Sequence, residues 1–552
     1  MKKIGTRVAA LALAVFAMAF VASCGDDEGG GGNGGKTGGS IKIGSVLPDK
    51  YDPVLYQTIQ AYQALHLVYT PLLSFKNVEG AEGQDLIPGL ATKLPEITNA
   101  GKTYKLTLRK GLKYSDGSPI RASDFENTIK RLLKLGGPFS SFVTPIEGAP
   151  EFQEKGDFAA DIPGIETNDQ TGEITINLSE ADTKFQFALA ESYTAPTPAA
   201  KSPGKSLNNP GPPGYGPYTI DIENPSRQFT LTKNRKFDIP GLAKGNADKM
   251  TVIKSSVSRM TQDVINGKLD FMTEDPAGDL LPQVRQKYSD RFRLDANPSN
   301  IYYFSLNVTV PPFDKLEARQ AVNYAIDSRA LVRIFGGRLA PGCTFIPPGV
   351  IGFKESTNEN CPFGKPDGPG DIEKAKQLVE KSGTKGETVT MWTNNKDPRP
   401  AIGDYMRDLL NQIGYKAKVK TLDQQVYFDQ LGLKRNKAQI GFTDWYMDFP
   451  HPGDLFEPSI DSSSLESEPI FNTSYVADKQ IDAKLQELKG KDPKDVEEEW
   501  AALDKEVVEE KAYVAVYGYE KASTFMSERM DFENCSGVHP VFKNDWSQFC
   551  LK

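Results

Sequence analysis

The chain has 552 residues, of which 38% are hydrophobic and 25% are charged, and its formal net charge is -8. One hydrophobic core rarely extends over so many residues, so we expect two or three domains. The negative charge repels phosphate backbones and anionic lipid headgroups, which excludes nucleic acid as an expected partner.

The first 23 residues have the layout of a signal peptide. Basic residues precede an uninterrupted apolar run from Val8 to Ala22, and small residues come directly before Cys24. This run is shorter than the roughly 20 apolar residues of a membrane-spanning helix, and acidic, Gly-rich sequence follows it instead of a basic flank. We therefore expect removal of residues 1–23.

The Val-Ala-Ser-Cys ending of this segment resembles the lipobox of bacterial lipoproteins. It predicts a lipidated Cys24 and anchoring of the protein to the outer face of the cell membrane, with further acyl chains making the anchor stable. The alternative is an ordinary secretory signal with a chance cysteine. Residues 24–40 then form a Gly-rich tether, because they contain almost no apolar side chains to bury.

The first third of the mature chain mixes strand and helix patterns. Residues 41–46 indicate an opening strand, and residues 106–112 alternate before a Ser-Asp-Gly-Ser turn. Ser123 and Glu126 have the spacing of a capping box, and one apolar face follows it, formed by Phe125, Ile129, Leu132 and Leu133. A Gly-containing turn separates residues 165–168 from 173–178, which predicts a hairpin. The region up to about residue 212 is therefore an α+β unit.

The second half alternates more regularly between the two patterns. In order, it contains a helix from Ile372 that stops at Gly383, a strand at 389–392, a helix that stops at Gly414 and a strand at 415–422. A strand, a helix and a strand in this order imply a right-handed crossover and a parallel sheet. Such sheets present ligand clefts beyond the carboxyl ends of their strands.

Two loops are expected at that edge of the sheet. The first follows Trp392. The second is the segment 444–454, which follows a strand at 437–443 with Ala438, Ile440 and Phe442 on one face. Both are candidate binding loops.

Four cysteines remain besides Cys24, namely Cys343, Cys361, Cys535 and Cys550. An even number in an oxidising compartment predicts disulfides, and the pairs closest in sequence are the simplest of the three connectivities. A zinc site is the alternative, although the chain has no C-x-x-C spacing and only three histidines.

Several motifs in a fixed order resemble the extracellular solute-binding proteins of family 5, the peptide- and nickel-binding subunits of ABC importers. They are Tyr69–Leu73, Ile87–Ala91, Tyr104–Gly117, Ala122–Asp124, Gly214–Tyr218, Tyr303–Asn307, Pro311–Phe313 and Ala318–Asp327. Trp445–Pro452 resembles the family's loop with two aspartates, except that His451 stands where the second aspartate is usual.

The resemblance implies an α/β fold of the periplasmic-binding-protein type (type II), in which a hinge joins two main lobes and an α+β lobe is inserted. We expect lobe I at 41–75, 213–305 and 515–552, the inserted lobe at 76–212 and lobe II at 306–514. A solute would be trapped between lobes I and II and delivered to the membrane permease by a monomer that needs no cofactor.

The resemblance also nominates ligand-binding residues. Asp448 matches the position of the family's amine-binding aspartate, and Trp445 beside it is an apolar, cation-attracting wall. Arg399 is a candidate for the ligand carboxylate, with Trp392 and Asn394 lining the same cleft. The alternative is that the tryptophans belong to the core and that Arg399 is a solvated surface charge.

A peptide is the favoured solute, and a nickel or other metal chelate, a siderophore or an oligosaccharide are the alternatives. A lipoprotein hydrolase is a different class of protein, but the chain has neither G-x-S-x-G nor H-E-x-x-H, and its three histidines are scattered. A lipoprotein that presents a surface to another protein, without small-molecule cargo, is a third possibility.

Overall fold

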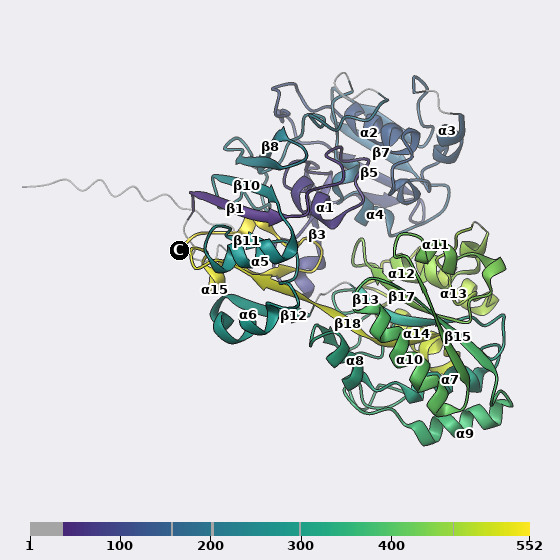
Figure 1. Ribbon diagram of the computed structural model, residues 1–552. Coiled ribbons are helices and arrows are strands. Elements are labelled where there is room, and N and C mark those ends of the chain that lie inside the picture. Colours follow the sequence, from purple (N-terminus) through teal and green to yellow (C-terminus); the bar gives the residue numbers. More distant parts are fainter. Residues whose placement is uncertain (1–36, 156–157, 200–203, 297–299, 467) are drawn as a thin grey trace, which may run out of the picture. The chain divides into compact units, whose positions relative to one another are not determined.

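The computed structural model describes residues 37–155, 158–199, 204–296, 300–466 and 468–552 (Figure 1). The chain divides into residues 1–32 and residues 33–552, so all the described residues belong to the second unit. The predicted signal peptide, Cys24 and most of the predicted tether lie outside the described residues. Among the described residues, no helix has the length and apolar character needed to cross a membrane.

The first sheet combines the start of the chain with a segment that returns after residue 217. Its strand order is β11-β1-β10-β9-β8, and β1 runs parallel to both of its neighbours. Its strands are β1 (Ser40–Ser45), β8 (Tyr218–Asn224), β9 (Gln228–Lys233), β10 (Lys249–Lys254) and β11 (Phe271–Met272). The helices of these segments are α1 (Ile59–Leu65), α5 (Val257–Ile265) and α6 (Leu281–Lys287).

The segment between these two parts forms a four-stranded sheet with its own helices. The strand order is β4-β5-β7-β6, and the predicted hairpin is its antiparallel pair β6–β7. The strands are β4 (Glu96–Thr98), β5 (Thr103–Thr107), β6 (Ile165–Asn168) and β7 (Glu173–Asn177), with α2 (Ser123–Lys134), α3 (Ala149–Lys155) and α4 (Phe185–Ala188). A two-stranded sheet of β2 (Leu73–Phe75) and β3 (Leu86–Pro88) precedes it.

Helix α2 buries the predicted apolar face, but its predicted capping box is wrong. The helix begins at Ser123, and the preceding residue makes no side-chain cap. Ser123 instead donates its amide N–H and its hydroxyl to Asp169, at 2.9 and 3.0 Å. A carboxylate from the β6–β7 turn therefore replaces the local cap that the sequence predicted.

The large sheet contains the predicted parallel strands. Its order is β12-β18-β13-β17-β15-β16, with β14 paired to β18, and β15 runs parallel to both β16 and β17. The strands are β12 (Phe292–Ala296), β13 (Asn300–Leu306), β14 (Leu339–Ala340), β15 (Thr388–Asn394), β16 (Lys416–Leu422), β17 (Ile440–Tyr446) and β18 (Val514–Phe525).

The remaining α-helices lie between the strands of this sheet in the sequence, except α15, which follows β18. They are α7 (Leu316–Ala325), α8 (Ser328–Ile334), α9 (Ile372–Ser382), α10 (Arg399–Ile413), α11 (Tyr427–Leu431), α12 (Gly453–Ser459), α13 (Lys479–Lys489), α14 (Glu497–Lys505) and α15 (Phe532–Cys535). As predicted, α9 and α10 end at Gly383 and Gly414, which take left-handed backbone conformations with φ of 73° and 114°.

The remaining elements are short. They are the 3-10 helices η1 (Ala81–Gln84), η2 (Ser140–Phe142), η3 (Ser192–Thr194), η4 (Ser289–Arg291), η5 (Lys434–Asn436), η6 (Ser462–Leu465) and η8 (Trp546–Gln548), the π-helical turn η7 (Glu506–Glu510), and the strands β19 (Val538–His539) and β20 (Lys543–Asn544).

The strand predicted at 437–443 begins three residues later than expected. Lys437 has a φ of 46°, in the left-handed region, and closes η5 before β17 begins at Ile440. The predicted face is nevertheless buried, since Ala438, Ile440 and Phe442 are all 2% exposed or less. The strand also ends later than predicted, at Tyr446 instead of Thr443.

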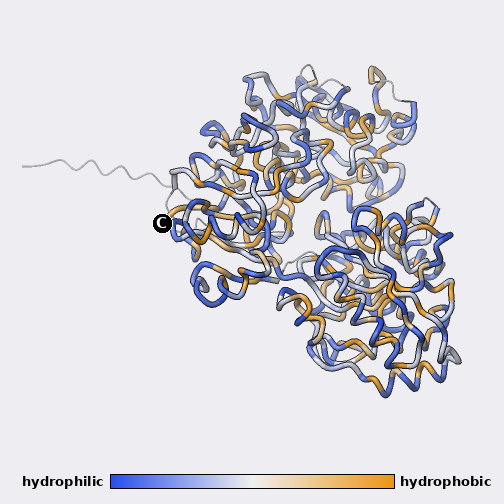
Figure 2. Tube along the Cα trace, in the orientation of Figure 1, coloured by the Kyte–Doolittle hydropathy of each residue, from blue (hydrophilic) through white to orange (hydrophobic). Residues whose placement is uncertain are grey.

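The buried apolar side chains form four clusters. Figure 2 shows hydrophobic residues (orange) alternating with hydrophilic ones (blue) along the chain. One cluster extends through both the first sheet and the four-stranded sheet, so these two parts share a core. Two clusters belong to the large sheet, one packed with α7, α9 and α10 and the other with α12, α13 and α14. The smallest joins α5 and α6 to β12 and β18.

Strand β18 belongs to both halves of the large sheet. Its first residues pair with β13 as far as Gly518, and its last residues pair with β12 from Lys521 onward. Just beyond the strand, Met526 bridges to Phe271 of the first sheet. One continuous strand therefore links the parallel part of the large sheet to the first sheet.

The structure contains both disulfides that proximity in sequence suggested. Cys343 is bonded to Cys361 and Cys535 to Cys550, each pair with its Cα atoms 5.6 Å apart. The second pair ties α15 to the C-terminal residues, where Trp546 and Phe549 enter the shared core.

Replacing Cys535 and Cys550 together by serine should lower the free energy of unfolding by roughly 3 kcal/mol, because the unfolded chain regains the freedom that a 15-residue crosslink removes. Denaturant titration measures the loss. The matched double variant C343S/C361S, with a separation of 18 residues, should lose a similar amount. Recovery of four alkylatable thiols in non-reducing peptide mapping would contradict both pairings.

Candidate functional site

The candidate site is built around the segment that follows β17. Because β17 runs parallel to β15, its carboxyl end lies at the edge of the sheet where ligand loops are expected. Trp445 and Asp448 are half-buried there, and Tyr446 is 50% exposed. The structure therefore leaves both predicted residues of this loop accessible at the predicted edge.

Asp454, in the first turn of α12, fixes the positions of Asp448 and Trp445. Its Oδ2 atom accepts the backbone N–H of Asp448 at 3.0 Å and the indole N–H of Trp445 at 3.2 Å. Its Oδ1 atom is buried without a hydrogen-bond partner, and the residue is 3% exposed. One carboxylate thus holds the two predicted ligand residues, Asp448 and Trp445, in place.

A third carboxylate, that of Glu191, comes from the distant segment between α4 and η3. Glu191 is 2% exposed, and its charge acts on both Asp448 and the hydroxyl of Tyr193. Burial raises the pKa of Glu191 to about 8. Burial and the charge of Glu191 raise the pKa of Asp448 to about 7. Burial and Asp448 raise the pKa of Asp454 well above its usual value. We refer to Glu191, Asp448 and Asp454 as the carboxylate trio.

Few cations face the trio. Lys543 lowers the pKa of Asp448, and burial lowers its own pKa to about 8. Lys184 acts on Asp454 but is also paired with Glu457 and with Asp182, the latter at 3.2 Å. The buried negative charge near Asp448 is therefore only partly compensated by the protein itself.

Tyrosine hydroxyls complete the surroundings of the trio. Tyr193 is 1% exposed, and its hydroxyl has no hydrogen-bond partner among the described residues. The charges of all three carboxylates raise the pKa of this hydroxyl. The hydroxyl of Tyr56 contacts Ser192 Oγ at 3.1 Å. A cavity of about 50 Å³ adjoins Glu191 and is also lined by Tyr62. The trio thus lies among polar groups rather than in apolar packing alone.

Arg399 is buried and already pairs with a carboxylate of the protein. It lies in the first turn of α10, is 7% exposed and forms an ion pair with Asp444 at 3.0 Å. Its guanidinium also lies over the rings of Phe442 and Tyr302, at 3.6 and 4.7 Å from the ring centres. Asp444 compensates the charge through Nη2, whereas Nη1 is buried without a hydrogen-bond partner among the described residues. Arg399 is therefore not a solvated surface charge, and its contact with a ligand carboxylate stays a prediction.

Trp392 and Asn394 also face inward. Trp392 belongs to the buried cluster on the α10 side of the sheet, and Lys420 Nζ lies 3.5 Å from the centre of its ring. Asn394 is buried, and its Oδ1 atom accepts the backbone N–H of Lys396 at 3.1 Å. For Trp392, the structure has the core position that we named as the alternative to ligand contact.

On the other side of Asp448, Phe449 joins the loop to the shared core of the N-terminal half. Its ring is buried, stacks with Phe187 at 5.9 Å and meets the edge of Phe142 at 5.0 Å. Asp448 is therefore held next to Glu191 by apolar packing of its immediate neighbour.

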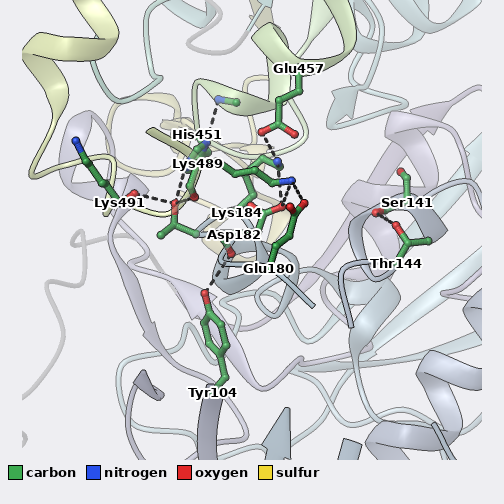
Figure 3. A network of polar contacts seen from close by, with 12 residues as sticks. Tyr104, Ser141, Thr144, Glu180, Asp182, Lys184, His451, Glu457, Lys489 and Lys491 are labelled. Carbon is green, nitrogen blue, oxygen red and sulfur yellow. Dashed lines mark hydrogen bonds and ion pairs between the residues drawn. The ribbon is translucent and has the colours of Figure 1, made fainter. Parts of the chain in front are cut away.

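His451 continues this contact through polar groups (Figure 3). Its Nδ1 atom accepts the backbone N–H of Gly453 at 2.9 Å, which leaves the ring proton on Nε2, 3.2 Å from Thr183 Oγ1. Burial lowers the pKa of His451 well below its usual value, so the ring is neutral. The residue that departs from the family pattern thus connects two segments of the protein and does not titrate near neutral pH.

Ion pairs surround this contact (Figure 3). Lys184 pairs with Glu457 of α12, and Lys489 at the end of α13 pairs with Glu180 at 2.5 Å. The segment 180–184 is therefore fixed to α12 and α13 by charged side chains on both sides of Thr183.

A second cavity, of about 190 Å³, lies on another side of Trp445. It is lined mainly by apolar and hydroxyl side chains: Phe428, Asp429, Thr443, Asp444, Trp445, Pro469, Ile470, Phe471 and Thr473. Trp445 meets the edge of Phe471 at 5.6 Å, and Phe471 is among the most exposed large apolar residues of the described chain. The sequence analysis found neither this cavity nor the roles of Glu191 and Asp454.

Comparisons with known proteins agree with this architecture. The family model of the bacterial extracellular solute-binding proteins, family 5 Middle, matches residues 85–466. The glutathione-binding protein GsiB of Escherichia coli (strain K12) is 26% identical over 407 residues, which are 72% of this chain and 74% of the relative.

Two solved structures show the same fold. The clavulanic acid biosynthesis oligopeptide binding protein 2 is 21% identical with a TM-score of 0.84, covering 94% of this chain and 96% of that one. The periplasmic binding protein DppA from Helicobacter pylori, in complex with the peptide STSA, is 20% identical with a TM-score of 0.70, covering 94% and 98%.

The buried acid Glu191 predicts a specific dependence of stability on pH in the absence of ligand. Its pKa is about 8 in the folded protein and about 4.3 in an unfolded chain, so its ionisation reduces stability as pH rises from 4.3 through 8. The variant Glu191→Gln cannot ionise. Its Tm relative to the wild type should therefore increase between pH 5 and pH 8.5, in thermal melts without ligand.

The control is Glu359→Gln, at an exposed position, whose Tm difference from the wild type should not change with pH. Parallel pH profiles for wild type and Glu191→Gln would show that Glu191 is not a buried, strained acid.

Proposed function

Because the chain belongs to the bacterial extracellular solute-binding proteins of family 5, we propose that it captures a peptide through its free ammonium group and delivers it to the membrane permease of an ABC importer. It is a solute-binding protein and not an enzyme. The observation that carries the proposal is Asp448, a half-buried carboxylate at the carboxyl end of β17 with too little positive charge around it.

A ligand ammonium meets the needs of this position. It supplies the positive charge that Asp448 and its neighbours lack, and charge-assisted hydrogen bonds of this kind are about twice as strong as neutral ones. The indole of Trp445, fixed by Asp454, offers an aromatic face to the same cation. The cavity of about 190 Å³ beside Trp445 has room for an apolar side chain of the ligand.

The names of the relatives agree with this solute class. GsiB is a glutathione-binding protein, and DppA was solved with a peptide of four residues. Glutathione is itself a small peptide with a free ammonium group and is therefore a specific candidate. For a metal ion, by contrast, no group of three or more His, Cys, Asp or Glu side chains has a suitable arrangement among the described residues.

Capture would occur by closure of lobe I (41–75, 213–305 and 515–552) against lobe II (306–514). The inserted lobe spans 76–212. Glu191 belongs to the inserted lobe, whereas Asp448 and Asp454 belong to lobe II. Ligand contacts that exist only when these lobes meet shift the equilibrium toward the closed form, which the permease then recognises. We propose that the protein acts as a monomer.

The variant Asp448→Asn tests the proposal directly. It keeps the shape of the side chain but removes its charge, so peptide binding at pH 7 should weaken by about 2 kcal/mol or more, measured by isothermal titration calorimetry with short peptides and glutathione. N-terminally acetylated peptides should bind the wild-type protein as weakly as free peptides bind the variant.

The control Asp221→Asn changes an exposed aspartate of β8 and should bind like the wild type. Equal affinities of free and acetylated peptides would show that Asp448 is not the amine partner. Binding of only a sugar or a metal chelate would exclude peptides as the solute.

Lipid anchoring at Cys24 is proposed from the sequence and is tested separately. Mass spectrometry of the membrane-extracted protein should find an acylated cysteine at the mature N-terminus, and Cys24→Ala should release the protein into the soluble fraction because the acyl chains supply the membrane affinity. A mature N-terminus elsewhere, without acyl chains, would contradict the proposal.

A further inference from the structure

The three carboxylates of the trio exceed what a single ligand ammonium requires. Asp448 alone, beside an aromatic wall, is sufficient to bind one ammonium group. The structure adds Asp454, which is held against the backbone of Asp448, and Glu191, whose charge is close enough to act on Asp448. Asp454 and Glu191 are almost completely buried, and burying a carboxylate without a counter-charge is costly.

An observation independent of the acidic cluster also indicates a ligand. Among the described residues, the hydroxyl of Tyr193 is buried without a hydrogen-bond partner, and the charges of all three carboxylates of the trio act on it. Buried polar atoms in native proteins are nearly always satisfied. The unsatisfied hydroxyl beside the cluster is therefore available to a polar group that a ligand brings.

The charges facing the trio can be counted. Lys543 contributes one positive charge near Asp448 that Glu520 shares, and Lys184 is shared with Glu457 and Asp182. Tyr56, Tyr62 and Tyr193 are neutral, since burial raises the pKa of each of them, and His451 is neutral as well. Three ionised carboxylates against Lys543 and one ligand ammonium would leave one negative charge without a partner.

We propose that this end of the site accepts two positive charges, so that the preferred ligand is a peptide whose first residue is basic, with its α-ammonium at Asp448 and its side-chain cation at Asp454 and Glu191. The inference rests on the proposed function. It adds a substrate class, namely peptides with a dicationic N-terminal residue, and two further specificity-determining residues.

Without ligand, protons take the place of the missing cations. The raised pKa values of Glu191 and Asp448, about 8 and 7, mean that the trio carries protons at neutral pH. A dication stabilises the ionised carboxylates and displaces these protons. Binding should therefore release protons and should strengthen between pH 6 and pH 7.5, below the range in which the ligand's own α-ammonium, with a pKa of about 7.7–8.0, deprotonates.

The experiment compares Lys-Ala-Ala, Ala-Ala-Lys and Ala-Ala-Ala by isothermal titration calorimetry at pH 7. The first two peptides have the same composition and net charge, and only the position of the side-chain cation differs. Lys-Ala-Ala should bind at least about tenfold more tightly than Ala-Ala-Lys, because only its cation reaches the close carboxylates. Titrations in buffers of different ionisation enthalpy should show proton release for Lys-Ala-Ala.

For each variant, the readout is the ratio of the affinities for Lys-Ala-Ala and Ala-Ala-Lys. In Glu191→Gln and in Asp454→Asn the ratio should fall to about threefold or less, since one carboxylate partner of the side-chain cation is lost. The amide of each variant still accepts hydrogen bonds, and the two substitutions lie in different segments, so one remains informative where the other fails to fold. Asp221→Asn should keep the wild-type ratio.

Equal binding of Lys-Ala-Ala and Ala-Ala-Lys to the wild type would overturn the inference and leave the proposed function intact. A preference for Lys-Ala-Ala that persists in both Glu191→Gln and Asp454→Asn would overturn the roles of these residues. Failure of all three peptides and of glutathione to bind would instead refute the proposed function, and the inference with it.

Discussion

The segment that follows β17 is the feature on which the site depends, because it carries a carboxylate into a place where a carboxylate is unfavourable. Burial and the charge of Glu191 oppose the ionisation of Asp448 by raising its pKa, although a side-chain hydrogen bond with Asp454 lowers that pKa. Phe449, the neighbour of Asp448, offsets this cost by packing between Phe142 and Phe187, and full burial of such a side chain contributes about 1.5–3 kcal/mol. Apolar packing thus keeps the charged group where a ligand can use it.

The origin of the three carboxylates explains how ligand binding and closure are coupled. Glu191 belongs to the segment between α4 and η3, whereas Asp448 and Asp454 belong to the end of β17 and to α12. When the two segments separate, the like charges separate as well, and the unfavourable interaction between them is relieved. A cation placed among them reverses this preference, because it is attracted to both segments only when they are together. A ligand shifts an equilibrium only by its differential affinity for the two states, and the trio is a physical source of that difference.

Most of the fold could be predicted from local patterns in the sequence. The parallel strands β15 and β16, the helix stops at Gly383 and Gly414 and the hairpin β6–β7 follow from periodicity and turn residues. The patterns failed where a distant group takes over a local role. Asp169 caps α2 in place of Ser123, and no spacing within the helix reveals this.

For the site, the parallel strands predicted only the loop 444–454, and the family resemblance nominated Asp448 and Trp445 within it, while Glu191 could not be predicted from either. Glu191 lies 257 positions before Asp448, and its only local signal is that it is a single acid following the mostly apolar segment Phe185–Ala190, which contains Gln186. The surroundings of Arg399 could not be predicted either, because its partners, Asp444 and the rings of Tyr302 and Phe442, come from neighbouring strands. Strand register, which periodicity does not give, decides whether such a charge is free.

His451 shows how the number of charges in this region is controlled. The family pattern has an aspartate at this position, and here that carboxylate would add a further negative charge close to the trio and to Glu457. The neutral imidazole instead accepts the N–H of Gly453 and faces Thr183, which fixes the loop without adding charge. The second carboxylate of the loop is found three residues later, at Asp454, where it holds both Asp448 and Trp445. The position that departs from the family pattern therefore joins two segments of the protein without a charge, and the acids of the loop beyond β17 are Asp448 and Asp454.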